Sequence, residues 1–501
     1  MFTQVWREYW GLLEDPFTCE DADKDGVLPD VDPNAVHWSF DRLYGTPRMP
    51  APAIIFGEKG SGKSALRLMM RRKMEKHNQD KPDEKLFLIE YIDFNNYLSH
   101  FRRSIGARND DKAAEQVMKR WGVADHLDCL LSLGVSKLVD EVLPSESPRD
   151  KLNHKQRAYL ALMASIYYDS SQRTQMEAVH QLISRLGLGS LRPYFYWLLT
   201  FLMTVASFFL AALPVAANFN RAAEQAPMPI LPFVIGGGIL LAIAWLPFLY
   251  YTWMSTSFAA RADRAVKGLP RNSAAFKELL KRLPLKERRE YTIPRGSDEA
   301  GRYQLLQRFI EILHAFGYKG VYVLLDRIDE PSLISGREDS MRKFVESLLD
   351  IKLLQFPDLG LKLFLPIEMD EIHRNATPEQ LKKMRLDKSN LVPELKWTGQ
   401  ELYEIANQRV KSCVKPDGRI QGLADLFGDD FDFAYLKETL HNLGTPRYAF
   451  GFLSTLFSEY TKNLPNELGD GDPRWQVSRA HFDVVKAGWT DRSDIMRRVL
   501  N

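Results

Sequence analysis

The sequence predicts a three-layer α/β fold whose parallel sheet is interrupted by a helical insertion and a two-helix transmembrane hairpin, and is followed by a C-terminal helical lid. Three observations support this prediction. Residues 53–74 combine an apolar run, a glycine-rich loop and a helix-forming run; two long uncharged apolar runs occupy 193–217 and 229–252; and the apolar run 320–325 ends in Asp326. Strands that alternate with helices are typical of parallel sheets covered by helices.

Composition limits the class of protein. A chain of 501 residues exceeds what one hydrophobic core supports, so we expect at least two structural units. The net charge of +2 lacks the basic excess of a dedicated nucleic-acid binder. No apolar stretch follows the N-terminus, so no cleavable signal peptide is expected. The widely spaced cysteines predict reduced thiols in the cytoplasm and neither disulfides nor a zinc site; they are Cys19, Cys129 and Cys413.

The glycine-rich loop matches the pattern G-x-x-x-x-G-K-[ST] through Gly57, Gly62, Lys63 and Ser64. Glycines let backbone N–H groups and the N-terminus of the following helix point at an anion. We therefore expect a nucleoside triphosphate site, with ATP and GTP both open, in which Lys63 reaches the β- and γ-phosphates and the Ser64 hydroxyl ligates Mg²⁺. The alternative is a glycine-rich turn without a ligand. The residues expected to contact nucleotide are Gly57, Glu58, Lys59, Gly60, Ser61, Gly62, Lys63, Ser64 and Ala65.

The strand predicted at 320–325 would supply the metal side of the same site. Asp326 at its carboxyl end can hold Mg²⁺ through water, at the edge where parallel α/β sheets bind ligands. Asp329 or Glu330 is then expected to orient or deprotonate the attacking water, and the sequence does not decide between them. The alternative is a core strand that ends in an acidic surface turn.

The runs 193–217 and 229–252 are each long enough to span a hydrocarbon core of about 30 Å, which takes about 20 helical residues. The short connection 218–228 then forces an antiparallel hairpin. The alternative is a buried helical hairpin of a soluble protein. By the positive-inside rule, basic flanking residues predict a multi-pass protein of the bacterial inner membrane with both termini in the cytoplasm; they are Arg173, Arg185, Arg192, Arg261, Arg264, Lys267 and Arg271.

The second span contains Gly236, Gly237 and Gly238, which could allow close packing between hairpins in a homo-oligomer. They could equally be tolerated small residues.

Lys63 and Asp326 lie much farther apart in the chain than one βαβ unit requires. The simplest account is one nucleotide-binding domain into which the hairpin and its helical neighbours are inserted. The predicted segments are an N-terminal segment (1–45), the first part of the core (46–107), a helical insertion (108–192), the two spans (193–217 and 229–252), the second part of the core (253–390), a helical lid (391–460) and a C-terminal tail (461–501).

Two further side chains could face the nucleotide. Glu368 follows the apolar strand predicted at 361–368 and could act as a sensor of the γ-phosphate, although a solvent-facing glutamate is the more ordinary interpretation. The run Gly444-Thr-Pro446-Arg447 resembles the sensor-2 element of AAA-like ATPases. Pro446 suits a first helical turn, which would aim Arg447 at the nucleotide; the alternative is an ordinary surface arginine.

An acidic turn at 21–32 matches the start of an EF-hand calcium loop through Asp21, Asp23, Asp25 and Gly26. Asp32 stands where a bidentate glutamate is expected, and prolines at 29 and 33 spoil the exiting helix. A solvated acidic turn is therefore favoured over a calcium site.

Gly57–Ser64, the two inserted spans and the run 326–330 together resemble the KAP family of P-loop NTPases. The sequence departs from that family where an Asp-Asp-Leu-Asp-Arg-like run is expected, and STAND-like and AAA-like ATPases have similar acidic endings. The resemblance implies an ASCE-type parallel sheet and a membrane-anchored ATPase that switches conformation or assembly, in signalling or phage defence. Taken together, the expected catalytic residues are Lys63, Arg447 and one of Asp329 and Glu330, and the expected metal ligands are Ser64 and Asp326.

Residues 9–17 resemble the opening segment of ExeA-type secretion ATPases, which packs beside the nucleotide domain. That resemblance implies an alternative function, an energy-transducing ATPase of a secretion or DNA-transport machine.

Overall fold

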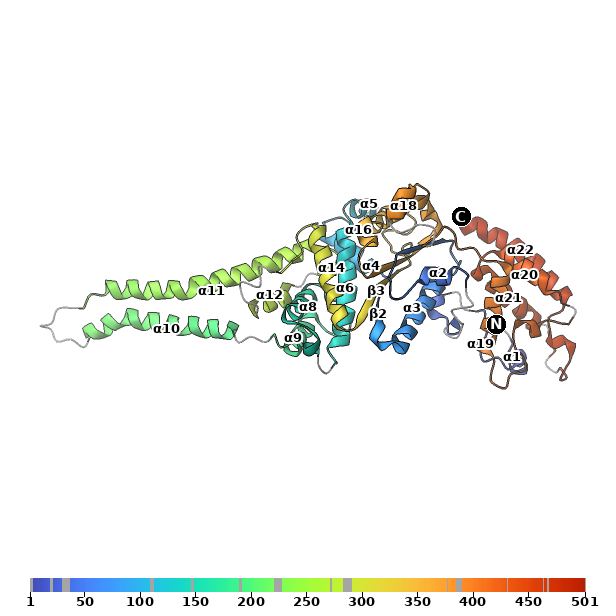
Figure 1. Cartoon of the computed structure of the whole chain (residues 1–501), viewed down its shortest axis with the longest axis horizontal. Helices are drawn as coiled ribbons and strands as arrows, with labels where there is room; N and C mark the ends of the chain where they lie inside the picture. The colour runs from blue at the N-terminus through green and yellow to red at the C-terminus, as the bar shows by residue number, and fades with distance from the viewer. Residues whose placement is uncertain are drawn as a thin grey trace. The chain divides into compact units, whose positions relative to one another are not determined.

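The computed structural model describes residues 3–18, 21–28, 37–108, 112–145, 148–188, 192–219, 228–270, 273–282, 291–375, 377–383, 390–429, 431–462, 464–465 and 468–500. The chain divides into two compact units. The first, here called the sheet unit, combines Met1–Asp93 with Gly317–Asn501, and the second, the helical unit, is Phe94–Phe316. The sheet unit is therefore built from two stretches of chain that flank the helical unit in sequence (Figure 1).

The sheet has five strands, all parallel, in the order β2-β3-β4-β1-β5. The strands are β1 (Ala53–Gly57), β2 (Lys85–Tyr91), β3 (Tyr318–Leu325), β4 (Leu359–Pro366) and β5 (Leu391–Val392). Their side chains are mostly buried apolar residues, as expected for a parallel sheet. Gly57 pairs with Pro366, so the carboxyl ends of β1 and β4 reach the same edge, where ligands bind in α/β sheets.

The predicted α/β class with a parallel sheet is confirmed. The sequence predicts strands at 53–56, 85–94, 320–325 and 361–368, and β1 to β4 lie within a few residues of these positions. β5 was not predicted. It occupies the first two residues of the segment 391–460, expected to be a helical lid, because Leu391 and Val392 pair with the edge of β1. Two residues carry too little periodicity to identify a strand from sequence.

The helices of the sheet unit depart from the predictions at 340–354 and in the C-terminal tail. The sequence pattern at 340–354 predicts one amphipathic helix, and this helix is divided because the Asp350 side chain accepts a hydrogen bond from the Leu353 N–H and caps a separate short helix. The tail contains a helix that was not predicted, α22. The helices are α1 (Gln4–Trp10), α2 (Phe40–Tyr44), α3 (Lys63–Asp80), α15 (Glu338–Leu348), α16 (Ile351–Leu354), α17 (Glu371–Arg374), α18 (Pro378–Lys383), α19 (Gly399–Cys413), α20 (Phe433–Leu443), α21 (Pro446–Lys462) and α22 (Arg479–Leu500).

The N-terminal helix α1 packs against the C-terminal part of the sheet unit. The indole N–H groups of Trp6 and Trp10 both donate to the Trp475 carbonyl oxygen, and the Tyr9 ring stacks on Trp475 with the ring centroids 3.8 Å apart. The Leu13 N–H donates to the Cys413 carbonyl oxygen at 2.8 Å. The first and last parts of the chain therefore form one hydrophobic core.

The helical unit consists of helices in its described residues: α4 (Asn95–Ser104), α5 (Ala113–Met118), α6 (Val123–Val142), α7 (Pro148–Lys151), α8 (His154–Tyr167), α9 (Gln175–Arg185), α10 (Arg192–Phe219), α11 (Leu231–Ala265), α12 (Ser273–Arg282) and α14 (Glu299–Ala315). An ion pair is buried among them. Arg302 on α14 and Asp128 on α6 each have side chains 1% exposed, and the Arg302 guanidinium also donates to the Ala265 carbonyl oxygen at the end of α11.

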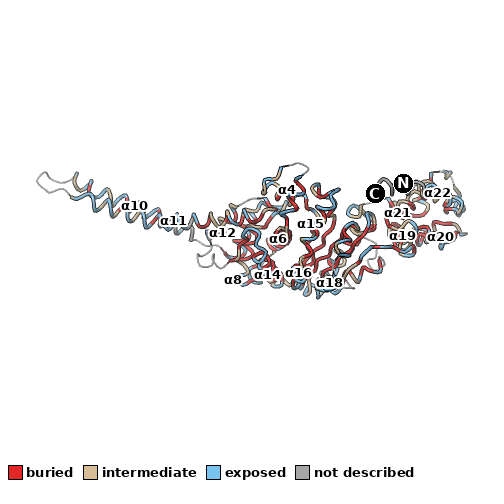
Figure 2. Tube along the Cα trace, turned by 90° about the horizontal axis from the view of Figure 1, so that it is seen from above, coloured by how far each residue is buried: buried red, intermediate tan, exposed pale blue. Residues whose placement is uncertain are grey.

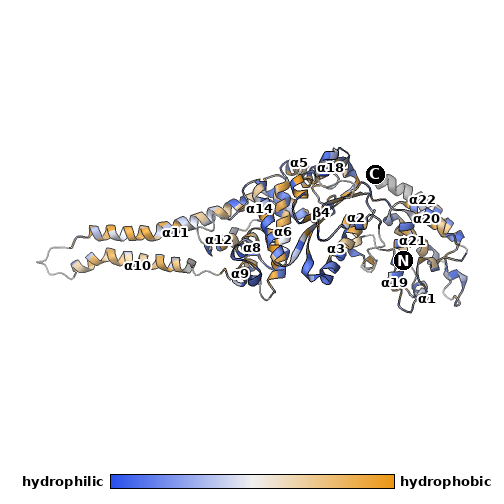
Figure 3. Ribbon diagram, viewed as in Figure 1, coloured by the Kyte–Doolittle hydropathy of each residue, from blue (hydrophilic) through white to orange (hydrophobic). Residues whose placement is uncertain are grey.

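Helices α10 and α11 lie side by side and are long and apolar enough to cross a membrane. Figure 3 shows the apolar character of both, and Figure 2 shows that most of their residues are exposed. Residues 220–227, most of the predicted connection 218–228, lie outside the described residues. Helix α11 continues to Ala265, beyond the predicted end of the second span at 252.

Within this hairpin, one of the three glycines has a defined packing role. The Ser207 hydroxyl donates to the Gly237 carbonyl oxygen at 2.6 Å, and a Cβ atom on Gly237 would lie 2.9 Å from the Ser207 carbonyl oxygen. A Cβ on Gly238 would meet nothing within 4 Å. Gly237 therefore permits close contact between α10 and α11 of the same chain.

Candidate functional site

A cavity of about 880 Å³ lies in the sheet unit at the carboxyl edge of the sheet. Its walls come from the glycine-rich loop, the ends of β3 and β4, the C-terminal helices and the N-terminal segment. The predicted site residues that line it are Lys59, Gly60, Gly62, Lys63, Ser64, Ala65, Asp326, Asp329, Glu330, Glu368 and Arg447. Residues from four separate parts of the sequence therefore meet at one cavity.

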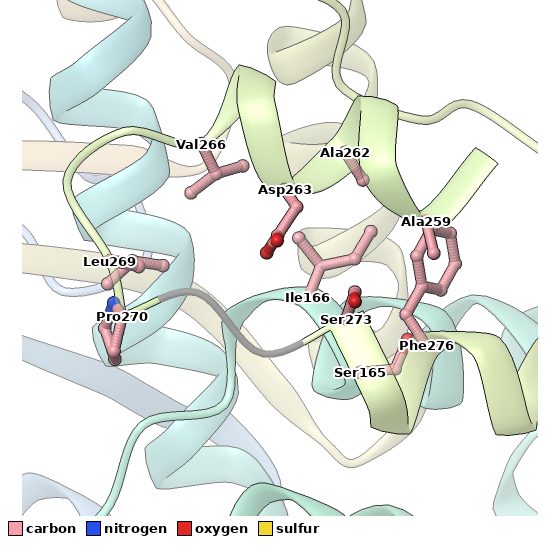
Figure 4. A pocket seen from close by; sticks show the side chains of 10 residues that line it. All are labelled: Ser165, Ile166, Ala259, Ala262, Asp263, Val266, Leu269, Pro270, Ser273 and Phe276. Atoms are coloured by element: carbon pink, nitrogen blue, oxygen red, sulfur yellow. The ribbon is translucent and has the colours of Figure 1, made fainter. Parts of the chain in front are cut away.

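A second hollow, in the helical unit, is much smaller. It has a volume of about 20 Å³ and lies between α8, α11 and α12, where the Asp263 side chain points toward it (Figure 4). That volume holds roughly one water molecule, so it is no site for an organic ligand.

The glycine-rich loop adopts a conformation that only glycine takes easily. β1 ends at Gly57 and α3 begins at Lys63, and between them Gly60 and Gly62 have φ angles of 88° and 93°. A Cβ on Gly60 would also lie 2.8 Å from the Arg447 Cβ. The backbone turn thus requires glycine at 60 and 62, and the close approach of α21 requires it at 60 as well.

Lys63 folds back over this loop. Its ammonium donates to the carbonyl oxygens of Gly57 at 2.6 Å and Glu58 at 2.9 Å. Burial lowers the pKa of Lys63, and the carboxylates of Asp326, Asp329 and Glu368 act against that shift. These carboxylates are the negative charges that Lys63 faces at the cavity.

Ser64 and Asp326 meet directly although they are far apart in sequence. The Ser64 hydroxyl donates to Asp326 Oδ2 at 2.6 Å, and Asp326 is buried. A hydroxyl and a carboxylate are the hard oxygen donors that suit Mg²⁺, which takes few protein ligands and keeps waters and phosphate oxygens for the rest. No group of three or more His, Cys, Asp and Glu side chains that could hold a metal occurs in the described residues.

Asp329 and Glu330 lie in the turn after β3, and both are exposed at the cavity. Burial raises the pKa of Glu330, Arg327 opposes the shift, and Asp329 and Asp326 add to it. A raised pKa suits a carboxylate that accepts a proton near neutral pH. Arg327, between Asp326 and this pair, adopts a left-handed conformation with a φ of 61°, which turns the chain sharply after the strand.

Arg447 is the second residue of α21, which begins at Pro446 as predicted. Its backbone N–H donates to the Gly60 carbonyl oxygen at 3.3 Å, so the start of α21 is attached to the glycine-rich loop. The Arg447 Nε and the Ser61 hydroxyl are buried and have no hydrogen-bond partner among the described residues. Of these two residues, only Arg447 lines the cavity, where a polar ligand could accept a hydrogen bond from its Nε.

Trp397 supports the loop from the other side. Its indole N–H donates to the Ser61 carbonyl oxygen at 2.7 Å, and its ring lies against Gly62. The sequence predicts a helix after Trp397, with Thr398 as its N-cap and Glu401 three residues on, and this capping box is present at the start of α19. The contact with the loop had no signal in the sequence.

Sequence analysis also missed a group of arginines that bind the acidic turn. Asp23 pairs with Arg67 and Arg327, and Asp25 pairs with Arg409 at 2.6 and 3.1 Å. These arginines provide the positive charge that calcium would otherwise supply, so the described part of the turn does not support the calcium interpretation. Residues 29–32, the rest of the proposed loop, lie outside the described residues.

No protein-family model, no curated protein and no solved structure matches this chain. The function proposed below therefore depends on the residues and geometry of the site.

Proposed function

We propose that this chain is a membrane-anchored ATPase that binds ATP with Mg²⁺ and hydrolyses it slowly to switch conformation or assembly at the cytoplasmic face of the membrane. The observation that carries the proposal is the 2.6 Å hydrogen bond between Ser64 and Asp326 at the cavity that Lys63 also lines. A lysine, a hydroxyl and a strand-end carboxylate around a glycine-rich loop are the groups that phosphoryl transfer requires.

The strand order supports the same proposal. One strand, β4, lies between β1, which precedes the glycine-rich loop, and β3, which ends at Asp326. Because all strands are parallel, the glycine-rich loop and the acidic turn follow strands at the same carboxyl edge of the sheet, where α/β sheets bind ligands. A cavity of about 880 Å³ is also within the size range of cofactor sites, about 300–1,000 Å³.

Each group has a role in this mechanism. The backbone N–H groups of the loop and the Lys63 ammonium bind the phosphates, and Ser64 and Asp326 would hold Mg²⁺, which neutralises phosphate charge when bound. Asp329 or Glu330 orients the water and accepts its proton, since both line the cavity. Arg447 would contact the γ-phosphate from α21.

The enzymatic part is tested by Lys63→Ala in purified protein. Loss of the ammonium should lower the rate of phosphate release by about 100-fold or more, because it removes a charge aimed at the phosphates. Lys76→Ala, exposed on the same helix α3, is the matched control and should keep the wild-type rate. Equal rates for wild type and Lys63→Ala would contradict the proposal.

The membrane part rests on α10 and α11, which expose many large apolar side chains between Phe195 and Phe219 and between Leu231 and Trp253. Exposed apolar surface of this extent needs a lipid or protein cover. The protein should sediment with membranes and enter solution only with detergent. Recovery in the supernatant after high-speed centrifugation without detergent would exclude the hairpin.

A further inference from the structure

The acidic turn at Asp21–Asp25 is attached to the metal side of the site through Arg67. This arginine lies on α3, one turn after Ser64, and its side chain is 0% exposed. It donates to Asp326 Oδ2 at 3.2 Å, to Glu90 Oε1 at 2.7 Å and to Asp23 Oδ1 at 2.6 Å. Arg67 and Ser64 therefore hold the same oxygen atom of Asp326.

A guanidinium that is fully buried keeps its charge, so it must be surrounded by acceptors. Three carboxylates fill that role for Arg67, each bound by a different N–H group. Because the N–H groups of a guanidinium are fixed in one plane, its bonds to Asp23 and Glu90 determine the direction from which it binds Asp326. Removal of one of these acceptors frees the guanidinium to rotate and loosens the Asp326 side chain.

Asp23 reaches Asp326 by a second route. Its other carboxylate oxygen pairs with Arg327, the residue directly after Asp326, and Asp21 binds the same guanidinium at 3.1 Å. The turn itself is fixed at its far end, where Asp25 pairs with Arg409 on α19 and both side chains are nearly fully buried. One carboxylate, Asp23, thus holds arginines on two sides of Asp326.

We propose that Arg67 is a positioning residue for Asp326 and that Asp23, from the N-terminal acidic turn, holds Arg67 in that role. The inference rests on the proposed function, because it assigns Asp326 to Mg²⁺. It gives the acidic turn a role in the nucleotide site: the turn completes the support of a ligand contributed by β3. Groups that support a metal ligand typically change metal affinity by about 10- to 100-fold when they are removed.

The test measures how strongly Mg²⁺ improves nucleotide binding. The Kd of a fluorescent ATP analogue is determined in EDTA and in saturating Mg²⁺, and the ratio of the two values reports the metal contribution. In Arg67→Met the ratio should fall about 10- to 100-fold, while the Kd in EDTA stays near the wild-type value. Arg67→Lys, which keeps the charge, should recover part of the ratio.

Arg71→Met is the matched control. Arg71 lies one turn farther along α3 and contacts Glu90 at 3.3 Å, and no contact between Arg71 and Asp326 occurs in the described residues. This variant should keep the wild-type ratio. A merely structural role of Arg67 would change the two Kd values together and leave their ratio constant.

Asp23→Asn keeps the test valid if Arg67→Met does not fold, because Asp23 is partly exposed, with 30% of its side chain accessible. It should lower the ratio in the same direction as Arg67→Met. Wild-type ratios in both variants would overturn the inference and leave the proposed function intact. Absence of Mg²⁺-dependent nucleotide binding in the wild type would instead overturn the proposed function itself.

Discussion

Replacement of Arg302 by methionine should destabilise the helical unit by about 3–5 kcal/mol, the usual cost of breaking one half of a buried ion pair. The guanidinium forms two bonds with Asp128, at 2.9 and 2.8 Å, and donates to the Asp298 and Ala265 carbonyl oxygens, both at 2.9 Å. Methionine keeps much of the volume. It leaves the Asp128 charge buried against the Tyr167 hydroxyl.

Hydrogen exchange measured by mass spectrometry on detergent-solubilised protein is the appropriate assay, because a two-unit chain need not unfold in one step. Amides of α6, α8 and α14 that exchange through opening of the whole unit should exchange about 100- to 5,000-fold faster. Arg308→Met, on the same helix α14, is the control. Its partner Glu311 is 2.7 Å away, but both side chains are over one-third exposed, so the loss should stay under about 1 kcal/mol.

The effect of Arg302→Met should also depend on pH. Burial raises the pKa of Asp128, and Arg302 acts against that shift, so its removal raises the pKa further. In the folded variant Asp128 then keeps a proton that the same residue releases above about pH 4 in the unfolded chain. The variant therefore loses stability as the pH rises from about 4 to the pKa of Asp128 in the folded state. The cost should therefore be smallest in acid. Equal exchange rates for the Arg302 and Arg308 variants at neutral pH would refute the reasoning.

Two further predictions concern single residues in each unit. Burial lowers the pKa of Lys362, whose ammonium donates to the Leu43 carbonyl oxygen, to about 7. Between about pH 7 and 10 the unfolded chain binds a proton at Lys362 that the folded chain has released, so the stability of the wild type relative to Lys362→Met should rise by roughly 3 kcal/mol over that range. A difference in melting temperature between the two proteins that does not change with pH would contradict this. In the hairpin, Gly237→Val should lower the melting temperature, because the new side chain would clash with the Ser207 carbonyl oxygen at a cost of about 1–3 kcal/mol. Gly238→Val is the control, since a Cβ there meets nothing within 4 Å, and it should leave the melting temperature unchanged. Equal melting temperatures for the two variants would argue against the close helix contact.

The parts of this fold that could be predicted are those whose signal is local in sequence. The conformation of the loop from Gly57 to Ser64 could be predicted from its own residues, because glycines, a lysine and a serine at this spacing are typical of one loop conformation between a strand and a helix. Asp326 could be predicted because a buried strand that ends in a carboxylate has few other roles next to such a loop. Even there, the choice between Asp329 and Glu330 remains a prediction, because both side chains reach the cavity.

The rest depends on contacts between distant parts of the chain. Arg67 has the sequence context of an ordinary basic helix residue, and only the packing of α3 against β2, β3 and the N-terminal turn buries it among carboxylates. The same turn resembled a calcium loop, because three carboxylates at alternating positions are equally suited to a cation and to arginine side chains. Sequence patterns report which charges are present and not which partners neutralise them.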